Sequence, residues 1–233
     1  MKLKSCSQNS NENFVGCKVW INNCPVCYSL KPKFFMKVLS YNYWSCIKCE
    51  AKFLAPQHWL SSSDEYKHYL THKNDAADPN YRKFLSKLLE PMLSKLETHY
   101  TGLDYGCGPS SALAKMFIEN GYNTQLYDPF FAPNPETLIQ SYHFITCSEV
   151  VEYFYHPREE FDRLNTLLKP GGWLGIMTKF QTDDDRFKNW EYRRDPTHVV
   201  FYRSRTLEII AKQRGWYCEI AYKDVVLMQK PFC

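Results

Sequence analysis

The second half of the chain alternates short apolar runs with stretches whose apolar residues recur at helical spacing. Short apolar runs bounded by glycine or polar residues predict buried strands, and the helical spacing predicts helices that pack against them. Strands are predicted at residues 101–105, 122–127, 142–147, 173–178, 217–222 and 225–229, and helices at 111–120, 161–168 and 204–214. Strands and helices in this alternating order predict an α/β domain.

The first hundred residues follow another pattern. Residues 1–16 are rich in serine, asparagine and lysine without periodicity, which predicts a disordered tail. The segments 34–39 and 41–44 are β-prone and are separated by a break at Ser40. This part of the chain therefore predicts a small β-rich unit.

A helical region is predicted next. Serines and acids at 61–65 are typical of a helix start, and apolar residues over 81–96 trace one helical face. Pro91 lies inside that face and implies a kink or two abutting helices. The resulting division is a tail at 1–16, a β-rich unit at 17–60, a helical linker or lid at 61–98 and a main domain at 99–233.

Chain length agrees with this division, because 233 residues suffice for one main domain and a small appendage. No apolar run reaches the roughly 18 to 20 residues that span a bilayer. The N-terminal residues also have no signal-peptide core. We expect a cytoplasmic protein without a membrane partner.

Four of the ten cysteines form two Cys-x-x-Cys pairs, Cys24 with Cys27 and Cys46 with Cys49. Two such pairs on neighbouring hairpins supply the four thiolates of a tetrahedral structural zinc site. A unit this small buries little apolar surface, so bound zinc is expected to supply much of its folding free energy. The spacing predicts a zinc ribbon at residues 17–60, with no open position for catalysis.

The predicted ribbon is basic. Residues 1–60 contain eight lysines and two glutamates, a formal charge of +6 against +4 for the whole chain. Two interpretations stay open: the ribbon binds nucleic acid through Lys33, Lys37 and Lys48, or it packs on the next domain as a structural cap.

A glycine loop follows the first predicted strand, in the stretch Leu103-Asp104-Tyr105-Gly106-Cys107-Gly108-Pro109-Ser110. A strand that enters a glycine turn and leaves as a helix is typical of nucleotide-like ligand sites. A dinucleotide loop would need glycine at position 111, where this chain has Ser111. Asp128 ends the next strand, where a carboxylate can accept hydrogen bonds from both ribose hydroxyls.

This stretch resembles the first motif of the class I S-adenosylmethionine (SAM) dependent methyltransferases, an acid followed by alternate glycines. The match covers Asp104, Gly106 and Gly108, and Ser110 stands where a third glycine is common. Glu149-Val150-Val151-Glu152 also resembles this class, with Tyr153 at the usual histidine. The Pro-Gly-Gly turn at 170–172 is similar to the class as well.

The resemblance implies a Rossmann-like sheet with helices on both faces and a SAM site. In such enzymes a helix before the first strand closes over the cofactor, which implies a role for Tyr69 and His72. The residues implied for SAM are Asp104, Gly106, Cys107, Gly108, Ser110, Asp128, Pro129, Cys147, Glu149, Tyr69 and His72. Residues 129–142 are too few for the usual helix, strand and helix, so we expect a truncated or absent third strand.

Candidate catalytic residues are His198, Glu149 and Tyr202. A base is needed only where the acceptor loses a proton, and His198 in Pro-Thr-His resembles segments at the active-site mouth of related enzymes. A structural loop histidine is the alternative for His198. The three acids at 183–185 offer a divalent cation site, but a solvated loop is favoured.

The acceptor stays unidentified. Cys147-Ser148-Glu149-Val150 occupies the place of an Asn-Pro-Pro-Tyr-like motif, which disfavours amino methylation of exposed bases, so we expect a small-molecule or protein acceptor more than RNA. One alternative is a zinc-ribbon binding module with an inactive methyltransferase-like domain, which Ser110 and Tyr153 support. The other is an RNA methyltransferase that holds its substrate with the ribbon.

Overall fold

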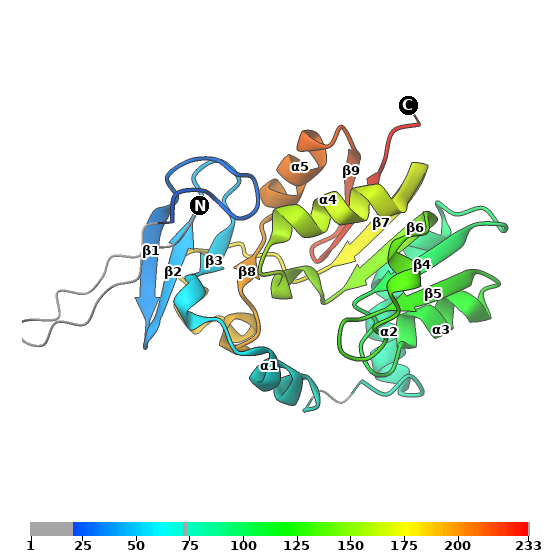
Figure 1. Ribbon diagram of the computed structural model, residues 1–233, viewed down its shortest axis with the longest axis horizontal. Helices are drawn as coiled ribbons and strands as arrows, with labels where there is room; N and C mark the ends of the chain where they lie inside the picture. The colour runs from blue at the N-terminus through cyan, green and yellow to red at the C-terminus, as the bar shows by residue number, and fades with distance from the viewer. Residues whose placement is uncertain (1–20, 72–73, 233) are drawn as a thin grey trace, which may run out of the picture.

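The computed structural model describes residues 21–71 and 74–232, so the predicted tail at 1–16 lies outside the described residues. Six strands form the central sheet: β4 (Thr101–Tyr105), β5 (Asn123–Tyr127), β6 (Tyr142–Ser148), β7 (Leu168–Met177), β9 (Tyr217–Tyr222) and β10 (Val225–Gln229). Their order in the sheet is β5-β4-β6-β7-β10-β9 (Figure 1). The first four are parallel, and β10 is antiparallel to both of its neighbours.

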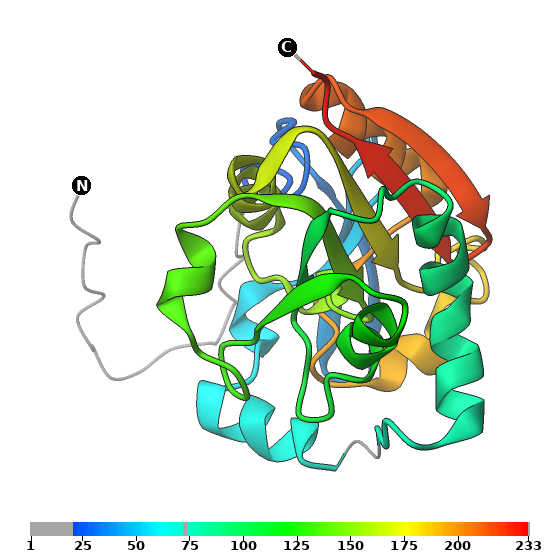
Figure 2. The ribbon, with the colours of Figure 1, turned by 90° about the vertical axis from the view of Figure 1, so that its right-hand side faces the viewer.

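Helices cover both faces of this sheet (Figure 2). The four helices are α2 (Pro79–Leu93), α3 (Ala112–Glu119), α4 (Pro157–Leu167) and α5 (Ser204–Gln213). Along β7, Leu174 and Ile176 belong to the core with α4 and α5, while Trp173 and Met177 belong to the core with α2 and α3. Successive strand residues point to opposite faces. The predicted α/β class with helices on both faces is confirmed.

The third strand of the class is absent from the described sheet, as the short segment predicted. The sheet ends at β5, and the following loop contains an isolated bridge between Asp128 and Ala132 and the short helix η2 (Pro135–Leu138). The edge of the sheet beside Asp128 is therefore covered by a loop.

Two local predictions differ from the structure. The strand β7 begins at Leu168, before the predicted turn, because Leu168 already pairs with Tyr142 through an irregular register. Gly171 accommodates that irregularity with a positive φ of 74°. The helix α2 is a single helix that runs through Pro91 and ends at Leu93.

A second, four-stranded sheet has the order β1-β2-β3-β8. We call it the cysteine sheet, because residues 21–54, the cysteine segment, supply its first three strands and carry the four clustered cysteines in the turns beside them. Its strands are β1 (Lys33–Val38), β2 (Tyr41–Ser45), β3 (Lys52–Leu54) and β8 (Val200–Phe201). The last strand comes from the second half of the chain, and Tyr43 and Phe53 share one core with Phe187 and Phe201. The cysteine segment and the main domain thus share a sheet and a core (Figure 1).

The helix α1 (Ser62–Tyr69) lies between β3 and β4 along the chain. Its N-cap is Ser61, whose Oγ accepts a hydrogen bond of 3.3 Å from the Asp64 amide. This N-cap agrees with the predicted helix start. Short single-turn helices are η1 (Pro56–His58), η3 (Val151–Tyr153), η4 (Phe187–Asn189) and η5 (Glu191–Arg194). No helix in the described part of the chain is both long enough and apolar enough to cross a membrane.

Candidate functional site

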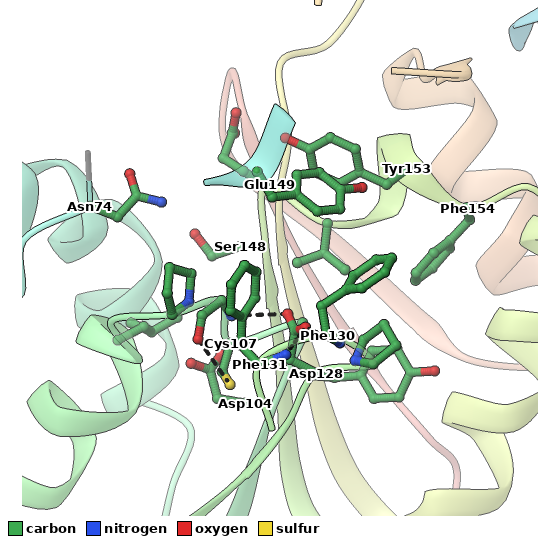
Figure 3. Close-up of a pocket in the computed structure, with 18 of the residues that line it drawn as sticks. Asn74, Asp104, Cys107, Asp128, Phe130, Phe131, Ser148, Glu149, Tyr153 and Phe154 are labelled. Carbon is green, nitrogen blue, oxygen red and sulfur yellow. Dashed lines mark hydrogen bonds between the residues drawn. The ribbon is translucent and has the colours of Figure 1, made fainter. Parts of the chain in front are cut away.

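A cavity of about 730 Å³ lies at the carboxyl ends of β4, β5 and β6 (Figure 3). The loops that follow these strands form its floor, and residues of α1, α2 and η5 close its sides. Open parallel sheets bind ligands at this edge because the loops there diverge and leave a crevice.

The glycine loop after β4 has the backbone that its sequence predicts. Gly106 and Gly108 have positive φ angles of 78° and 60°, a region that glycine adopts without steric cost. A Cβ on Gly106 would lie 2.6 Å from Val150, whereas a Cβ on Gly108 would meet nothing within 4 Å. Gly106 is therefore required by packing, and Gly108 leaves the backbone open to a ligand.

Asp104 ends in the floor of the cavity with only 3% of its surface exposed. Its Oδ1 accepts a hydrogen bond of 2.9 Å from the Thr146 hydroxyl. Burial raises the pKa of Asp104 to about 6, and the hydrogen bonds from Thr146 and the Ala114 backbone limit that rise. A cationic ligand group would favour the ionised form of this carboxyl.

Asp128 connects two loops of the site. Its Oδ2 accepts a hydrogen bond of 3.1 Å from the Gly108 amide, and its Oδ1 accepts bonds of 2.8 and 3.0 Å from the amides of Phe130 and Phe131. Figure 3 shows these contacts around the carboxylate. The three backbone donors fix the carboxylate at the edge of the sheet.

The two phenylalanines after Asp128 also line the cavity, and we did not predict them. The ring centroid of Phe130 lies 5.6 Å from that of Tyr69. A pair of aromatic residues two and three positions after the predicted ribose acid, in a loop at the sheet edge, was the available signal. Such rings offer an apolar surface for a ligand.

Most of the residues implied for SAM lie together at this cavity. The predicted residues that line it are Tyr69, Asp104, Gly106, Cys107, Gly108, Asp128, Pro129 and Glu149. Cys147 does not, because this strand residue points into the core with α4 and α5, and the next residue, Ser148, points to the cavity. Ser110 is not part of the lining either, and His72 lies outside the described residues.

Glu149 lies in the loop after β6 with a positive φ of 53°. Its amide donates a hydrogen bond of 2.7 Å to the Met177 carbonyl, which holds this unfavourable backbone. Burial raises the pKa of Glu149 to about 7, and the nearby Tyr192 hydroxyl and the charge of Lys179 limit the rise. A carboxyl with this pKa is suited to exchange protons near neutral pH.

Below Glu149, the fully buried Glu152 accepts hydrogen bonds from Thr178 at 3.0 Å and from the hydroxyl of Tyr192. Burial and the neighbouring Glu149 raise the pKa of Glu152 well above its ordinary value. This carboxyl therefore anchors Tyr192 from beneath the cavity.

His198 lines the cavity with its ring packed between two tyrosines, tilted against Tyr192 at a centroid separation of 4.2 Å and edge-on to Tyr153 at 4.9 Å. Its Nδ1 lies 2.7 Å from the Tyr192 carbonyl, which can only accept, so Nδ1 carries the hydrogen. The acceptor nitrogen of the neutral ring is then Nε2.

Tyr202 occupies a different environment from the one we expected. It is fully buried, lies outside the cavity lining and donates a hydrogen bond of 2.9 Å to the Val151 carbonyl. Its ring belongs to the core that contains α4 and α5. The prediction that Tyr202 acts in catalysis is corrected accordingly, and the residue is a core tyrosine.

The polar segment after β7 contributes more to the site than its composition suggested. Lys179, Glu191, Tyr192 and Asp195 line the cavity, whereas the prediction of a solvated loop concerned the acids at 183–185, which are not part of the lining. Among the three acids at 183–185, Asp184 instead forms ion pairs with Lys52 at 2.6 Å and with Arg203 at 2.7 Å, outside the cavity. Composition alone does not distinguish a polar surface loop from a polar segment that lines a cavity.

The four predicted zinc ligands converge. The Sγ atoms of Cys24, Cys27, Cys46 and Cys49 all lie within 4.8 Å of one another, and all four residues are buried. The separations are 3.7 Å for Cys24 with Cys49 and 3.6 Å for Cys27 with Cys46. Sulfurs around a tetrahedral zinc with bonds of about 2.3 Å lie about 3.8 Å apart.

The cysteine sheet holds the segment that carries Tyr192 and His198. The Leu54 amide of β3 donates a hydrogen bond of 2.8 Å to the Val199 carbonyl, directly after His198. The Val199 amide in turn donates to the Glu152 carbonyl at 2.9 Å. One side of the cavity is therefore built on the cysteine segment.

A family model described as a methyltransferase domain matches residues 77–219. A search of curated proteins gave no match. Three solved structures are similar in fold, each with a TM-score of 0.46. An O-methyltransferase family protein from Burkholderia thailandensis is 15% identical over 75% of this chain and 70% of that chain, and the N-methyltransferase NodS from Bradyrhizobium japonicum WM9, in complex with S-adenosyl-L-homocysteine, is 15% identical over 72% of this chain and 97% of that chain. The 1,6-didemethyltoxoflavin-N1-methyltransferase from Burkholderia thailandensis is 13% identical over 86% of this chain and 99% of that chain. These likenesses concern the fold alone. Because the family model covers more than half of the chain, the protein belongs to the methyltransferase domain family.

Proposed function

We propose that the protein transfers a methyl group from S-adenosyl-L-methionine to an acceptor that enters the same cavity. The observation that carries the proposal is the junction of the open glycine loop with Asp128 at 3.1 Å, above a buried Asp104. An acid beside a glycine loop suits a cofactor with an ammonium and a sulfonium, and it disfavours a pyrophosphate.

Each end of this junction has a proposed role. Asp128 accepts hydrogen bonds from ribose hydroxyls, the open backbone of Gly108 contacts the methionine part, and Asp104 balances its positive charge. Phe130 and Phe131 offer apolar surface beside Asp128. When bound, SAM supplies a methyl group made electrophilic by its positively charged sulfur. Cys107, Pro129 and Tyr69 are further lining residues on this side.

On the acceptor side, Glu149 or His198 removes a proton where the acceptor must lose one. Glu149 has a pKa of about 7, and the Nε2 atom of His198 is the acceptor nitrogen of its ring. The surrounding rings exclude water and orient the acceptor, which is the main contribution a protein makes to this type of transfer.

Zinc is proposed for the four cysteines. The buried thiols and their separations of 3.6 and 3.7 Å fit a tetrahedral thiolate site with no open position. Zinc would stabilise the cysteine sheet and, through β3, the segment around His198. This role corresponds to the structural cap that the sequence left open.

Exposed lysines favour a second role for the ribbon. Lys33, Lys37 and Lys48 are exposed on the cysteine sheet and its turn, where they can contact an RNA that carries the acceptor. Binding to bulk RNA that weakens with salt and is lost on substituting the three lysines by glutamine supports this role. Salt-independent or absent binding leaves the small-molecule or protein acceptor.

Calorimetry with SAM and S-adenosylhomocysteine tests the proposed function. Binding of both at micromolar to millimolar concentration, together with transfer of labelled methyl from SAM into cell extract, is the expected result. Absence of binding at millimolar ligand would instead support a binding module whose methyltransferase domain is inactive.

A further inference from the structure

A series of connected rings begins at Phe130 and Tyr69, on the side of the cavity proposed for SAM, and continues into the half beyond it. Phe130, Tyr69, Tyr153, His198 and Tyr192 contact one another in that order, with centroid separations of 5.6, 5.3, 4.9 and 4.2 Å. All five line the cavity. We refer to these five residues as the aromatic wall.

The charges around the aromatic wall are unbalanced. Among the described cavity residues of this half, the carboxyl groups of Glu65, Glu149, Glu191 and Asp195 share one lysine, Lys179, and Asp195 also lies 3.1 Å from the imidazole of His68. Glu65 holds the wall in place, because it accepts a hydrogen bond of 2.6 Å from the Tyr69 hydroxyl. Carboxylates in excess over cations in a cleft create a negative potential that attracts positive ligands.

One contact in the cavity already has the geometry of a bound cation. The Lys179 ammonium lies 5.5 Å from the centroid of the Tyr192 ring. Cations within about 6 Å of a ring centroid are attracted by the negative face of the ring. The Tyr192 end of the aromatic wall therefore has the electrostatic character that favours an ammonium group, here that of Lys179.

We propose that the methyl acceptor is a cationic amine, which the aromatic wall and the carboxylates of Glu149, Glu191 and Asp195 bind together. The proposal rests on the proposed function, because this half serves an acceptor only if the methyl donor occupies the other half. A carboxylate or phosphate acceptor would face four carboxyl groups and one lysine. That arrangement costs affinity for an anion.

The transfer needs a base, because a protonated amine has no lone pair. Glu149 accepts the proton from the ammonium, and burial holds its pKa at about 7, close to the pH at which it must act. The nitrogen lone pair then forms the bond to the methyl carbon while the bond between methyl and sulfur breaks. The electron pair of that bond goes to sulfur, which becomes neutral.

Tyramine and tyrosol form a matched pair of probes, because they share one skeleton and differ in an ammonium against a hydroxyl. Binding of each is measured by calorimetry at pH 7 with the protein saturated by S-adenosylhomocysteine. We expect tyramine to bind at least about tenfold more tightly than tyrosol. Equal binding, tighter binding of tyrosol, or no binding of tyramine at about 10 mM would overturn the proposal.

Variants that remove a negative charge test which carboxyl groups cause the preference for tyramine over tyrosol. Glu191→Gln should reduce the ratio of tyramine to tyrosol affinity by about threefold, and Glu149→Gln by about tenfold. Glu208→Gln is the matched control, because Glu208 is an exposed acid on α5 outside the cavity lining. An unchanged ratio in both cavity variants would contradict the proposal.

S-adenosylhomocysteine binding distinguishes failure of the proposed function from failure of the amine acceptor alone. If the wild-type protein does not bind it, the proposed function fails. If it binds and tyramine is not preferred, only the amine acceptor fails. The same measurement on each variant shows that the cavity has kept its fold.

Discussion

The Oδ2 atom of Asp128, at the end of β5, accepts a hydrogen bond of 3.1 Å from the backbone amide of Gly108, in the loop after β4. This hydrogen bond joins the end of one parallel strand to the loop that follows its neighbour in the sheet. The contact fixes the open part of the glycine loop against the carboxylate that we propose for ribose.

Replacing Asp128 by asparagine should weaken S-adenosylhomocysteine binding at least about tenfold and lower the free energy of unfolding by about 1 to 3 kcal/mol. The amide group would place an NH₂ against backbone N–H donors that the carboxylate now satisfies. Calorimetry and urea unfolding measure the two effects. Glu136→Gln, at an exposed acid of the same loop, is the control. Wild-type affinity in Asp128→Asn would argue against the ribose role.

The two loop glycines should respond differently to alanine. Gly106→Ala places a Cβ 2.6 Å from Val150 and should destabilise the protein by roughly 1 to 3 kcal/mol. Gly108→Ala meets no neighbouring atom, so it should cost only about 1 kcal/mol of backbone strain while weakening cofactor binding. Thermal unfolding and calorimetry on both variants test this division. Equal loss of stability in the two would contradict it.

Asp104 should make stability depend on pH. Its pKa rises from 3.8 to about 6 on folding because the carboxyl is buried. Between these values the unfolded chain loses the proton and the folded protein keeps it, so stability falls as pH rises, by up to about 3 kcal/mol, and then stays constant above pH 6.

Asp104→Asn removes this component. The difference in unfolding free energy between variant and wild type should shift in favour of the variant between pH 4 and pH 7, by up to about 3 kcal/mol. Urea unfolding without ligand at both pH values measures it. The pH dependence of every other group is shared by the two proteins, so an equal difference at pH 4 and pH 7 would exclude a raised pKa at Asp104.

His198 and Tyr202 are four residues apart, and we expect substitution of the first to reduce methyl transfer and substitution of the second to reduce stability. His198→Ala removes a ring from the cavity wall and should reduce transfer of labelled methyl by about a hundredfold, with unchanged binding of S-adenosylhomocysteine. Tyr202→Phe removes only the hydrogen bond to the Val151 carbonyl and should cost about 1 to 2 kcal/mol of stability without loss of transfer. Transfer that survives in His198→Ala would remove this residue from the mechanism.

The cysteine sheet should influence the acceptor side more than the cofactor side. Cys46→Ser should abolish zinc binding and reduce methyl transfer more than S-adenosylhomocysteine affinity, because β3 holds Val199 next to His198. Metal analysis, calorimetry and methyl transfer are compared with Cys218→Ser, a cysteine of β9 outside the cluster. Stoichiometric zinc in Cys46→Ser would contradict the proposed site.

Local sequence determined much of the fold. Each predicted strand of the main sheet appears at the chain segment expected for it, except that β6 ends one residue later and β7 begins earlier, because apolar runs and glycine turns act over a few residues. The loop with Asp104, Gly106 and Gly108 and the acid Asp128 follow from the same short-range order. The convergence of the four cysteines also follows from their spacing.

The tertiary structure decided which side chains face the cavity. Cys147 and Ser148 are neighbours, but strand geometry sends the first into the core and the second to the site. His198 and Tyr202 lie on either side of the short strand β8, and the first lines the cavity while the second belongs to the core. No local pattern distinguishes these environments, because each depends on what packs against the segment.

The sequence also did not predict which segments far apart in the chain pair with each other. Strand β8 completes the cysteine sheet by pairing with β3, although about 150 residues separate the two strands. Lys179 and Tyr192, in the polar segment after β7, line the same cavity as Tyr153 and Glu149, although 26 or more residues separate them from those two along the chain. Periodicity and spacing determine elements and motifs, whereas long-range packing determines which of their residues share one cavity.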